Sequence, residues 1–410
     1  VDEAEELALL QLLANCMANE IERTRLLDQA RQRERRLAAL VDIIGQLTTT
    51  LDRDELLNRI MVYARELLDV EATSVWALDE ERGLLVLHAA TGAQGAQLKE
   101  VTVPIGEGLI GEVVASGRNL LVQDAQSDAR HYRGIDQHSG FETRSVLTVP
   151  LRSAAIQLGQ RGELRAAIIG GAQAINKRGA FSDDDVVLFE ALAAQAATVL
   201  RLSQLYGDTD RLLIGMIKAL AGAVDARDRH NRQHSQRVAD FSVAIAEAIG
   251  LPRAAVYHIR LGSLLHDIGK VGVPDLILDK PAALSEAEQA EMRRHPVYGY
   301  DILSQQELRW LLREELPALL EHHERLDGNG YPHGLSGAAI SPIGRIVAVA
   351  DVFDALTSDR LYKAGWPVEQ ALDYLRARAG SEFDPEYVAG LVQARADGKI
   401  ITQRERGESK

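Results

Sequence analysis

The chain has 410 residues, enough for two or three domains, and its 46% hydrophobic and 26% charged residues are ordinary for a globular protein. Its net charge of −14 argues against a general nucleic-acid binder or a protein drawn to anionic membranes. The only cysteine, Cys16, excludes disulfides within the chain and argues against zinc sites built on thiolates. No apolar run approaches the roughly 18 residues that predict a transmembrane helix, so we expect no membrane segment here and a cytoplasmic location.

Residues 3–40 are expected to form one long helix, because apolar side chains recur at helical spacing from Leu7 to Ile21. Residues 9–18 resemble residues 188–197, and both stretches follow an acidic pair, which indicates a duplicated domain. Since the chain begins with Val1, we expect a fragment in which residues 1–39 are the last helix of the first copy and a connecting helix.

Residues 40–206 show an α+β pattern. A helix is expected at about 53–68, and short apolar runs separated by glycine-containing turns follow it. These runs lie at residues 74–78, 84–89, 120–123, 145–151 and 164–170. The pattern predicts one antiparallel sheet flanked by helices.

Several stretches of this segment match one family in order: residues 108–114, 122–124 and 145–151, then Asn176, Lys177, Phe181 and Asp185. They resemble the GAF domain, which implies a sensor module for a small molecule. Family members that bind cyclic nucleotides carry a spaced Asn-Lys-Phe-Asp-Glu signature, and this makes Asn176 and Lys177 candidate ligand-site residues. Val186 stands where the glutamate would be, so the alternative is a dimerising module in which these residues are structural.

Residues 207–396 read as a string of helices, followed by a polar tail at 397–410. Eight of the eleven histidines fall between His230 and His333. A lone histidine on a helix is more often structural, but adjacent His-Asp and His-His pairs argue against that reading here. Burying so many ionisable groups together is costly unless something compensates, and a metal cluster is the natural compensator.

The pair His266-Asp267 suits such a cluster. Adjacent residues on a helix point about 100° apart, so the two side chains can reach different sides of one metal pair. Imidazole with carboxylate suits iron, manganese or zinc, whereas a calcium or magnesium cage uses oxygen alone. Two such metals can clamp a phosphodiester in line, which would explain why so many ligands converge.

Five blocks of this region match a second family in order: residues 265–275, 295–299, 322–332, 345–358 and 383–385. They resemble the HD-GYP family of bacterial cyclic-di-GMP phosphodiesterases, which implies an all-α HD-superfamily fold and two divalent metals, iron or manganese. The resemblance implies metal ligands at His234, His266, Asp267, His295, His322, His323 and Asp351.

The same resemblance implies roles for residues around the ligands. Lys270 would contact a scissile phosphate oxygen or help protonate the leaving group, with Asp267 as the other catalytic residue. The pocket would include Tyr331, with Arg360 and Lys363 gripping the dinucleotide. His230 lies four residues before His234 and could hold a third metal, or it could be an outer or exposed residue.

We therefore expect the end of one GAF domain, a complete GAF domain at 40–206 and an HD-GYP domain at 207–396. The expected reaction opens cyclic di-GMP to linear pGpG, and whether it continues to GMP is left open. Long helices on both sides of the GAF domain predict a parallel homodimer, through which a GAF ligand could bias catalysis. Two alternatives stay open, a hydrolase of another nucleotide such as cyclic GMP-AMP and a receptor for cyclic di-GMP without enzymatic activity.

Overall fold

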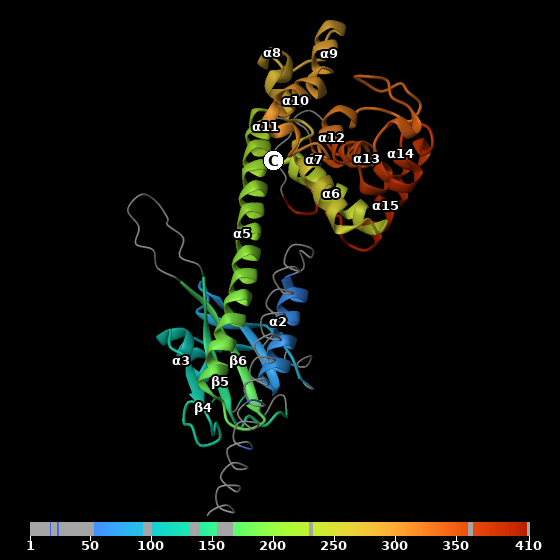
Figure 1. The fold of residues 1–410 in the computed structure, drawn as a ribbon. Helices are drawn as coiled ribbons and strands as arrows, with labels where there is room; N and C mark the ends of the chain where they lie inside the picture. The colour runs from blue at the N-terminus through green and yellow to red at the C-terminus, as the bar shows by residue number, and fades with distance from the viewer. Residues whose placement is uncertain are drawn as a thin grey trace, which may run out of the picture. The chain divides into compact units, whose positions relative to one another are not determined.

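The structure is a computed structural model that describes residues 53–92, 101–131, 140–153, 167–228, 233–359 and 364–407, with a few isolated positions besides. Of the helix expected at 3–40, only Met17 and Arg23 are described, and both are helical. The site candidates His230, Arg360 and Lys363 lie outside the described residues. The chain divides into two compact units, Val1–Asp208 and Thr209–Lys410, each with a hydrophobic core of its own (Figure 1).

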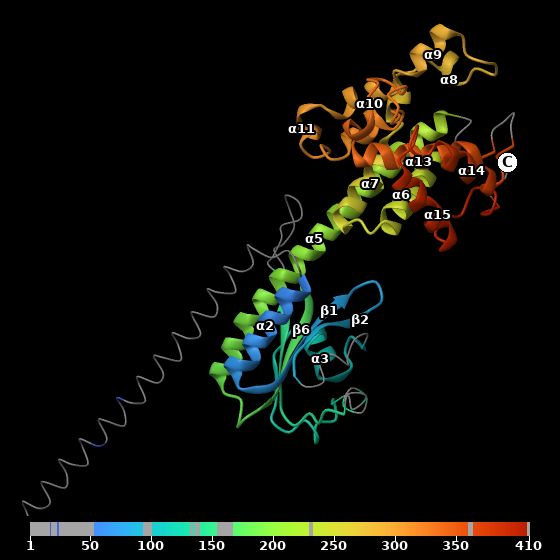
Figure 2. The same cartoon turned by 90° about the vertical axis from the view of Figure 1, so that its right-hand side faces the viewer.

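The first unit is built on one antiparallel sheet. Its elements are α2 (Arg53–Leu68), β1 (Val70–Asp79), β2 (Leu84–Ala90), β3 (Thr102–Pro104), α3 (Gly108–Ser116), β4 (Leu120–Val122), β5 (Val146–Arg152), β6 (Ile168–Lys177) and the first part of α5 (Asp183–Arg227). The strand order is β3-β2-β1-β6-β5-β4, and every pair is antiparallel. Helices α2 and α5 lie side by side and share a core with the central strands (Figure 2). Helix α3 packs separately against β1, β2 and β3, so helices cover the sheet on both sides and the expected α+β fold is confirmed.

Strand β6 differs from its expected position. The sequence analysis placed the last strand at 164–170, but it runs from Ile168 to Lys177 and pairs with both β1 and β5. Its centre is made of small residues, which an apolar pattern does not detect. A Cβ at Gly170 would lie 2.0 Å from the carbonyl oxygen of Trp76, and one at Gly171 would lie 2.5 Å from Ile110 Cδ1. Glycine is required there because the neighbouring strand and α3 approach the backbone closely.

Helix α5 is long and apolar enough to cross a membrane by length and composition alone, a weak test that core helices also pass. The sequence analysis expected no such segment. Within the described residues the first half of α5 contributes eight buried side chains to the core of the first unit: Leu188, Phe189, Leu192, Ala193, Ala196, Ala197, Val199 and Leu200. Packing against the sheet therefore accounts for much of its apolar character.

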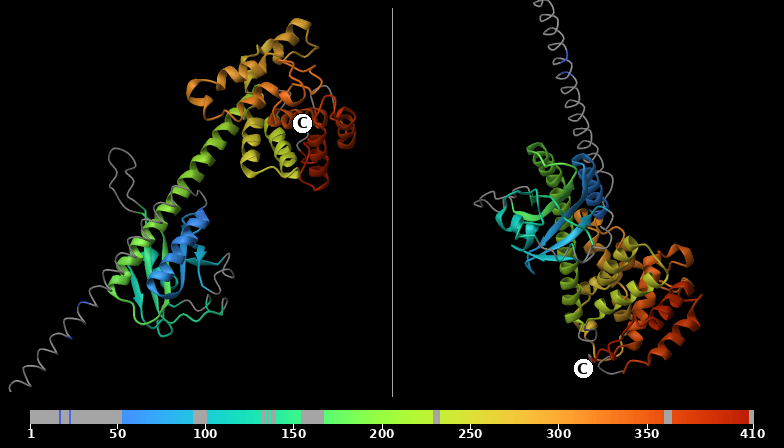
Figure 3. Two further views of the ribbon diagram at one scale, coloured as in Figure 1. Left: turned by 45° about the vertical axis from the view of Figure 1, so that its right-hand side comes forward. Right: turned by 90° about the horizontal axis from the view of Figure 1, so that it is seen from below.

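The second unit is helical, as expected, and no strand occurs among its described residues (Figure 3). After the end of α5 it contains α6 (His234–Ala248), α7 (Arg253–Leu265), the 3-10 helix η2 (Ile268–Gly272), α8 (Asp275–Leu278), α9 (Glu286–Met292), α10 (His295–Leu303), α11 (Gln306–Arg309), α12 (Leu316–Glu321), the 3-10 helix η3 (Gly337–Ala339), α13 (Pro342–Thr357), α14 (Val368–Arg378) and α15 (Pro385–Ala396). Its larger core joins α6, α13 and α15, and a second cluster joins α5, α7, α10 and α12.

Two glycines bring η2 against the start of α10. A Cβ at Gly269 would lie 1.9 Å from the carbonyl oxygen of His295 and 2.3 Å from the amide nitrogen of Gly299. No side chain fits between these two backbones, so the glycines allow a contact that larger residues would prevent. The consequence is that the segment carrying Lys270 lies directly beside the segment carrying His295.

Candidate metal centre

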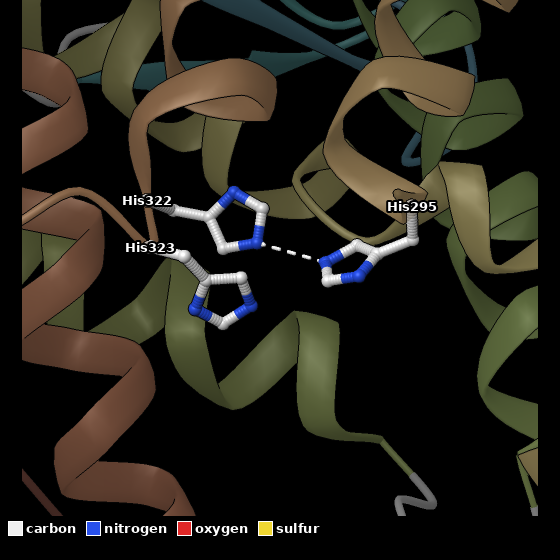
Figure 4. A group of neighbouring side chains, drawn as sticks. All are labelled: His295, His322 and His323. Atoms are coloured by element: carbon white, nitrogen blue, oxygen red, sulfur yellow. Dashed lines mark hydrogen bonds between the residues drawn. The ribbon is translucent and has the colours of Figure 1, made fainter. Parts of the chain in front are cut away.

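Seven predicted ligands converge in the second unit, and six of them stand at helix ends. His234 begins α6, His295 begins α10, His266 and Asp267 follow α7, and His322 and His323 follow α12, while Asp351 lies within α13. These residues include two groups of three, and within each group the ligand atoms lie within 4.8 Å of one another. One group is His234, His266 and Asp267; the other is His295, His322 and His323 (Figure 4).

Hydrogen bonds on the far side of four rings orient these histidines. Nδ1 lies 2.7 Å from Ser263 O in His266, 2.8 Å from Met292 O in His295 and 2.9 Å from Ala318 O in His322. In His234, Nδ1 lies 2.7 Å from the Asp354 carboxylate. Carbonyl and carboxylate oxygens only accept, so each Nδ1 carries the proton and donates it. In the neutral rings each Nε2 therefore keeps a lone pair that can bind a metal. Metal-ligating histidines typically donate their other ring N–H to a carbonyl or carboxylate in this way.

The facing nitrogens support a cation between them. His295 Nε2 and His322 Nε2 are 3.2 Å apart, although both carry lone pairs in the neutral tautomers just described (Figure 4). His266 Nε2 is fully buried and has no hydrogen-bond partner among the described residues. Facing lone pairs and an orphaned ring nitrogen are costly in a dry interior. A divalent cation removes both costs, so the donor set fits a metal centre.

Asp267 lies between the two groups. Its Oδ2 is 3.5 Å from His234 Nε2 and 3.4 Å from His266 Nε2, and its Oδ1 is 3.3 Å from His295 Nε2. One oxygen thus faces each group, which is the arrangement of a bridging carboxylate. Asp351 joins the first group to the second more loosely, with Oδ1 3.3 Å from His234 Nε2 and Oδ2 3.9 Å from His323 Nδ1.

Burial controls protonation in the second group. Burial and the neighbouring rings lower the pKa of His323 to about 3 and lower the pKa of His322 well below its usual value. These rings are neutral near pH 7 and are free to ligate. Burial also acts on His234, but its hydrogen bonds to three aspartates outweigh it and raise the pKa. A proton and a metal compete for that nitrogen, so metal affinity should fall as the pH falls.

Lys270 is held by two carboxylates. Its Nζ lies 2.7 Å from Asp267 Oδ2 and 3.1 Å from Asp228 Oδ2. Burial alone would lower the pKa of Lys270, but the two aspartates outweigh it and raise the pKa, so the ammonium keeps its charge. Asp228 was missed by the sequence analysis; its only signal there is its position two residues before His230.

The loop from His322 to Leu335 is shaped by Glu324, whose role the sequence analysis also missed. The buried Glu324 carboxylate accepts the amide hydrogens of His333, Gly334 and Leu335 at 2.7, 3.1 and 3.0 Å. A Cβ at Gly330 would lie 2.4 Å from Glu324 Cα, so only glycine lets the loop fold back this closely.

This loop places Tyr331 beside the centre. Its ring centroid lies 4.6 Å from that of His323, with 31° between the planes, and the Arg293 guanidinium lies 5.4 Å from the Tyr331 centroid. Tyr331 is half-buried, and its role at a substrate pocket stays a prediction.

Asp354 is the strongest contact that the sequence analysis did not find. It lies one helical turn after Asp351 on α13 and inside the matched block 345–358, and these two facts were its signals. Its Oδ2 accepts the Nδ1 proton of His234, and its two oxygens accept Arg237 Nε at 2.6 Å and Nη2 at 3.0 Å. His234, Arg237 and Asp354 are almost fully buried. Asp354 therefore fixes both the tautomer and the direction of the His234 ring.

Asp354→Asn is expected to lower metal affinity about 10- to 100-fold, since an outer partner of a ligating histidine is lost. It should also lower the free energy of unfolding by about 3 kcal/mol or more, because the buried Arg237 loses its counter-charge. Metal titration and thermal unfolding would measure the two effects. Asp240→Asn is a matched control on the same helix as His234, since Asp240 pairs with Arg406 at the surface. Equal metal affinity in both variants would contradict the role of Asp354.

The two GAF candidates are engaged inside the fold. Asn176 has a left-handed backbone, with φ 59°, and its side-chain oxygen accepts the amides of Arg144 and Ser145 at 2.7 and 3.2 Å. Its amide group donates to Glu71 and to the Glu142 carbonyl, both at 2.8 Å. These contacts occupy the side chain and favour the structural alternative.

Lys177 is occupied in a similar way. Its Nζ donates to Leu68 O at 2.7 Å and lies 3.1 Å from Asp185 Oδ1. The Asp185 carboxylate in turn accepts from Ser182 at the start of α5. The matched signature thus ties the end of β6 to α2 and to the first turn of α5.

Asn176→Ala is expected to lower the free energy of unfolding of the GAF domain by about 3 kcal/mol, because buried hydrogen bonds are lost and alanine tolerates a positive φ poorly. Chemical unfolding would measure this change. Asn119→Ala is the control, since Asn119 makes an exposed bond to Glu190 and should change stability by less than about 0.5 kcal/mol. Unchanged stability together with lost binding of a cyclic nucleotide would contradict the structural role.

Comparisons with known proteins assign one family to each of the two units. Residues 52–200 match the GAF domain family, and residues 218–387 match the HD domain family. The chain is 45% identical over 180 residues to the cyclic di-GMP phosphodiesterase response regulator RpfG of Xanthomonas campestris, covering 44% of this chain and 47% of RpfG. It is 42% identical over 179 residues to 3'3'-cGAMP-specific phosphodiesterase 2 of Vibrio cholerae, covering 43% of this chain and 34% of that protein.

A longer match includes both units. A cyclic di-GMP phosphodiesterase of Pseudomonas aeruginosa is 32% identical over 281 residues, which cover 68% of this chain and 66% of that protein. The matched parts span from about a third to two thirds of these three relatives. HD domains bind divalent metals, and the histidine and aspartate groups described above could hold such ions. The chain is therefore a member of the GAF and HD domain families, with a GAF domain at residues 52–200 and a helical HD domain at residues 218–387.

Proposed function

We propose that the HD domain hydrolyses cyclic di-GMP to linear pGpG, with at least two divalent ions held by the seven ligands. The observation that carries this proposal is the bridging position of Asp267 between two histidine groups, with the charged Lys270 beside it. The names of RpfG and of the Pseudomonas aeruginosa relative support the substrate.

The chemistry divides between the ions and the side chains. When bound, two divalent ions supply Lewis-acid activation of water and of the phosphodiester. Asp267 holds the two ligand groups together, and Lys270 offers N–H groups to the negative charge that develops on a phosphate oxygen. Because its pKa is raised, Lys270 serves as a fixed cation rather than as a base. Tyr331 lines the entrance, and Arg360 and Lys363 are proposed to grip the dinucleotide.

Iron and manganese are the proposed metals, because imidazole combined with carboxylate suits them and the sequence has no cysteine between residues 207 and 396. A third ion would need His230. Elemental analysis of protein purified without oxygen would identify the metal, and unchanged metal stoichiometry in His230→Ala would reject a role for His230 in holding a third ion.

Cyclic GMP-AMP is the second candidate substrate, because the Vibrio cholerae relative that acts on it is 42% identical, close to the 45% of RpfG. Turnover of purified, metal-loaded protein should be compared on cyclic di-GMP and 3'3'-cyclic GMP-AMP under one set of conditions. Higher kcat/KM on cyclic GMP-AMP would replace the first substrate by the second. Tight binding without turnover of either would leave a receptor and reject the enzyme.

The proposal also includes a homodimer of this chain and regulation of the HD domain by the GAF domain. Helix α5 contributes Leu192 to the core of the first unit and Val224 to a core of the second, so one helix belongs to both. Between these ends lie the exposed apolar residues Leu202, Leu205, Leu212 and Met216, separated by steps of three, seven and four residues. That spacing suits the seam of a two-stranded coiled coil. Light scattering would test the dimer, and deletion of residues 1–206 that changes neither the number of chains per particle nor the rate would reject both ideas. The single cysteine suits a reducing compartment such as the cytoplasm.

A further inference from the structure

The last turn of α5 contacts two segments of the site. One is η2, which carries Lys270, and the other is the start of α6, which carries His234. Asp225, Arg227 and Asp228 stand in this turn, and none of them is a predicted ligand. Their partners lie on η2, on the start of α8 and on the start of α6.

Arg227 binds the backbone in the second half of η2 and just after it. Its Nη1 donates to Lys270 O at 2.9 Å and to Val271 O at 2.8 Å, and its Nη2 donates to Val273 O at 2.8 Å. Its Nε donates to Asp275 at 2.9 Å, which anchors the guanidinium at the far end of the loop. The last carbonyls of a short 3-10 helix have few partners within the helix. Arg227 donates to two carbonyls of η2, those of Lys270 and Val271, and to the Val273 carbonyl just beyond it, and thereby fixes the main chain at Lys270 with one rigid planar group.

Asp225 performs the matching task for α6. The N-cap of α6 is Gln233, whose side chain makes no capping hydrogen bond. The buried Asp225 carboxylate instead accepts from Ser235 N at 3.1 Å and from Ser235 Oγ at 2.8 Å. A carboxylate at the first turn of a helix satisfies a free amide and stabilises the helix start. Ser235 adjoins His234, so Asp225 holds the helix end from which that ring projects.

We propose that Arg227 and Asp225 are positioning residues, which set Lys270 and His234 at their working separation without touching substrate or metal. Asp228, the residue after Arg227, adds a third contact, because its carboxylate pairs directly with Lys270 Nζ. The effect on turnover rests on the proposed phosphodiesterase function, whereas the effect on the loop does not.

The first test is hydrogen exchange in the whole protein, which needs no substrate. The amides of Lys270 and Val273 are bonded within this loop, to Asp267 O at 3.0 Å and Lys270 O at 3.1 Å. Arg227→Ala should make their exchange at least about tenfold faster, because opening the loop no longer breaks the guanidinium contacts. Arg376→Ala is the control, since Arg376 makes a single exposed ion pair with Asp373 and should leave both amides unchanged. Unchanged exchange in Arg227→Ala would overturn the proposal.

The second test separates positioning from folding. Arg227→Ala is expected to lower kcat about 10- to 100-fold, as a displaced catalytic group does, with KM and metal content close to those of the unchanged protein. Arg227→Lys, or guanidinium ion added to Arg227→Ala, should restore part of the rate. A fall in kcat that merely follows loss of metal, or no rescue at all, would overturn the role of Arg227. Asp225→Asn should lower metal affinity at His234, and unchanged affinity would overturn the role of Asp225. If the unchanged protein turns over no cyclic dinucleotide, the proposed function fails, and the exchange result still decides the positioning.

Discussion

Asp267→Asn is expected to lower kcat by about 1,000-fold or more, equivalent to about 4 kcal/mol of lost transition-state stabilisation. The amide keeps the shape of the side chain but offers one acceptor oxygen instead of two and carries no charge. The two histidine groups that Asp267 faces with separate oxygens would lose their common ligand. We also expect the metal content to fall by at least one ion per chain, measured by elemental analysis alongside steady-state turnover.

The matched control is Asp373→Asn, which removes one charge from the same unit at an exposed pair with Arg376. It should leave both metal content and kcat within about twofold, since single surface pairs contribute little. Full metal content in Asp267→Asn with a normal rate would contradict the bridging position of this carboxylate and, with it, the proposed reaction.

Lys270→Met is expected to lower kcat about 100- to 1,000-fold while metal content stays near that of the unchanged protein. Methionine fills similar space but removes the cation that the proposal places beside the phosphate. The raised pKa of Lys270 means that the unchanged protein keeps this charge at neutral pH and into the alkaline range, so no loss of rate from its deprotonation is expected near pH 8. A pH–rate profile and elemental analysis would test both statements.

Lys280→Met is the control for this change, because it also breaks a lysine–carboxylate pair in the HD domain, with Glu288. Lys270→Arg should recover part of the rate, since it keeps the charge but not the compact geometry. Loss of metal from Lys270→Met in proportion to its loss of rate would show that Lys270 holds the centre together rather than acting on the substrate.

Local sequence was a good guide to the helical fold that presents the predicted ligands. Three of the histidines owe their orientation to carbonyls three or four residues earlier, as in His266 with Ser263 O, so the helix end that carries the ring also sets its tautomer. The glycines of the matched blocks are visible in the sequence, but the sequence does not show why they are needed. The structure does, because at Gly269 and Gly299 two backbones come too close for a side chain. The expected α+β and all-α folds followed from apolar periodicity, except at β6, where small residues hide the strand.

The sequence by itself determined which side chains could hold metal, and that the first unit is α+β and the second helical, because both depend on residue type and on short spacings. Only the tertiary structure decided which groups support those ligands. Asp354 meets His234 across 120 residues, and Arg227 meets the backbone of Lys270 across 43. Such contacts depend on where separate helices pack rather than on any period along the chain. Charged residues like these read as ordinary surface positions until packing buries them beside a partner.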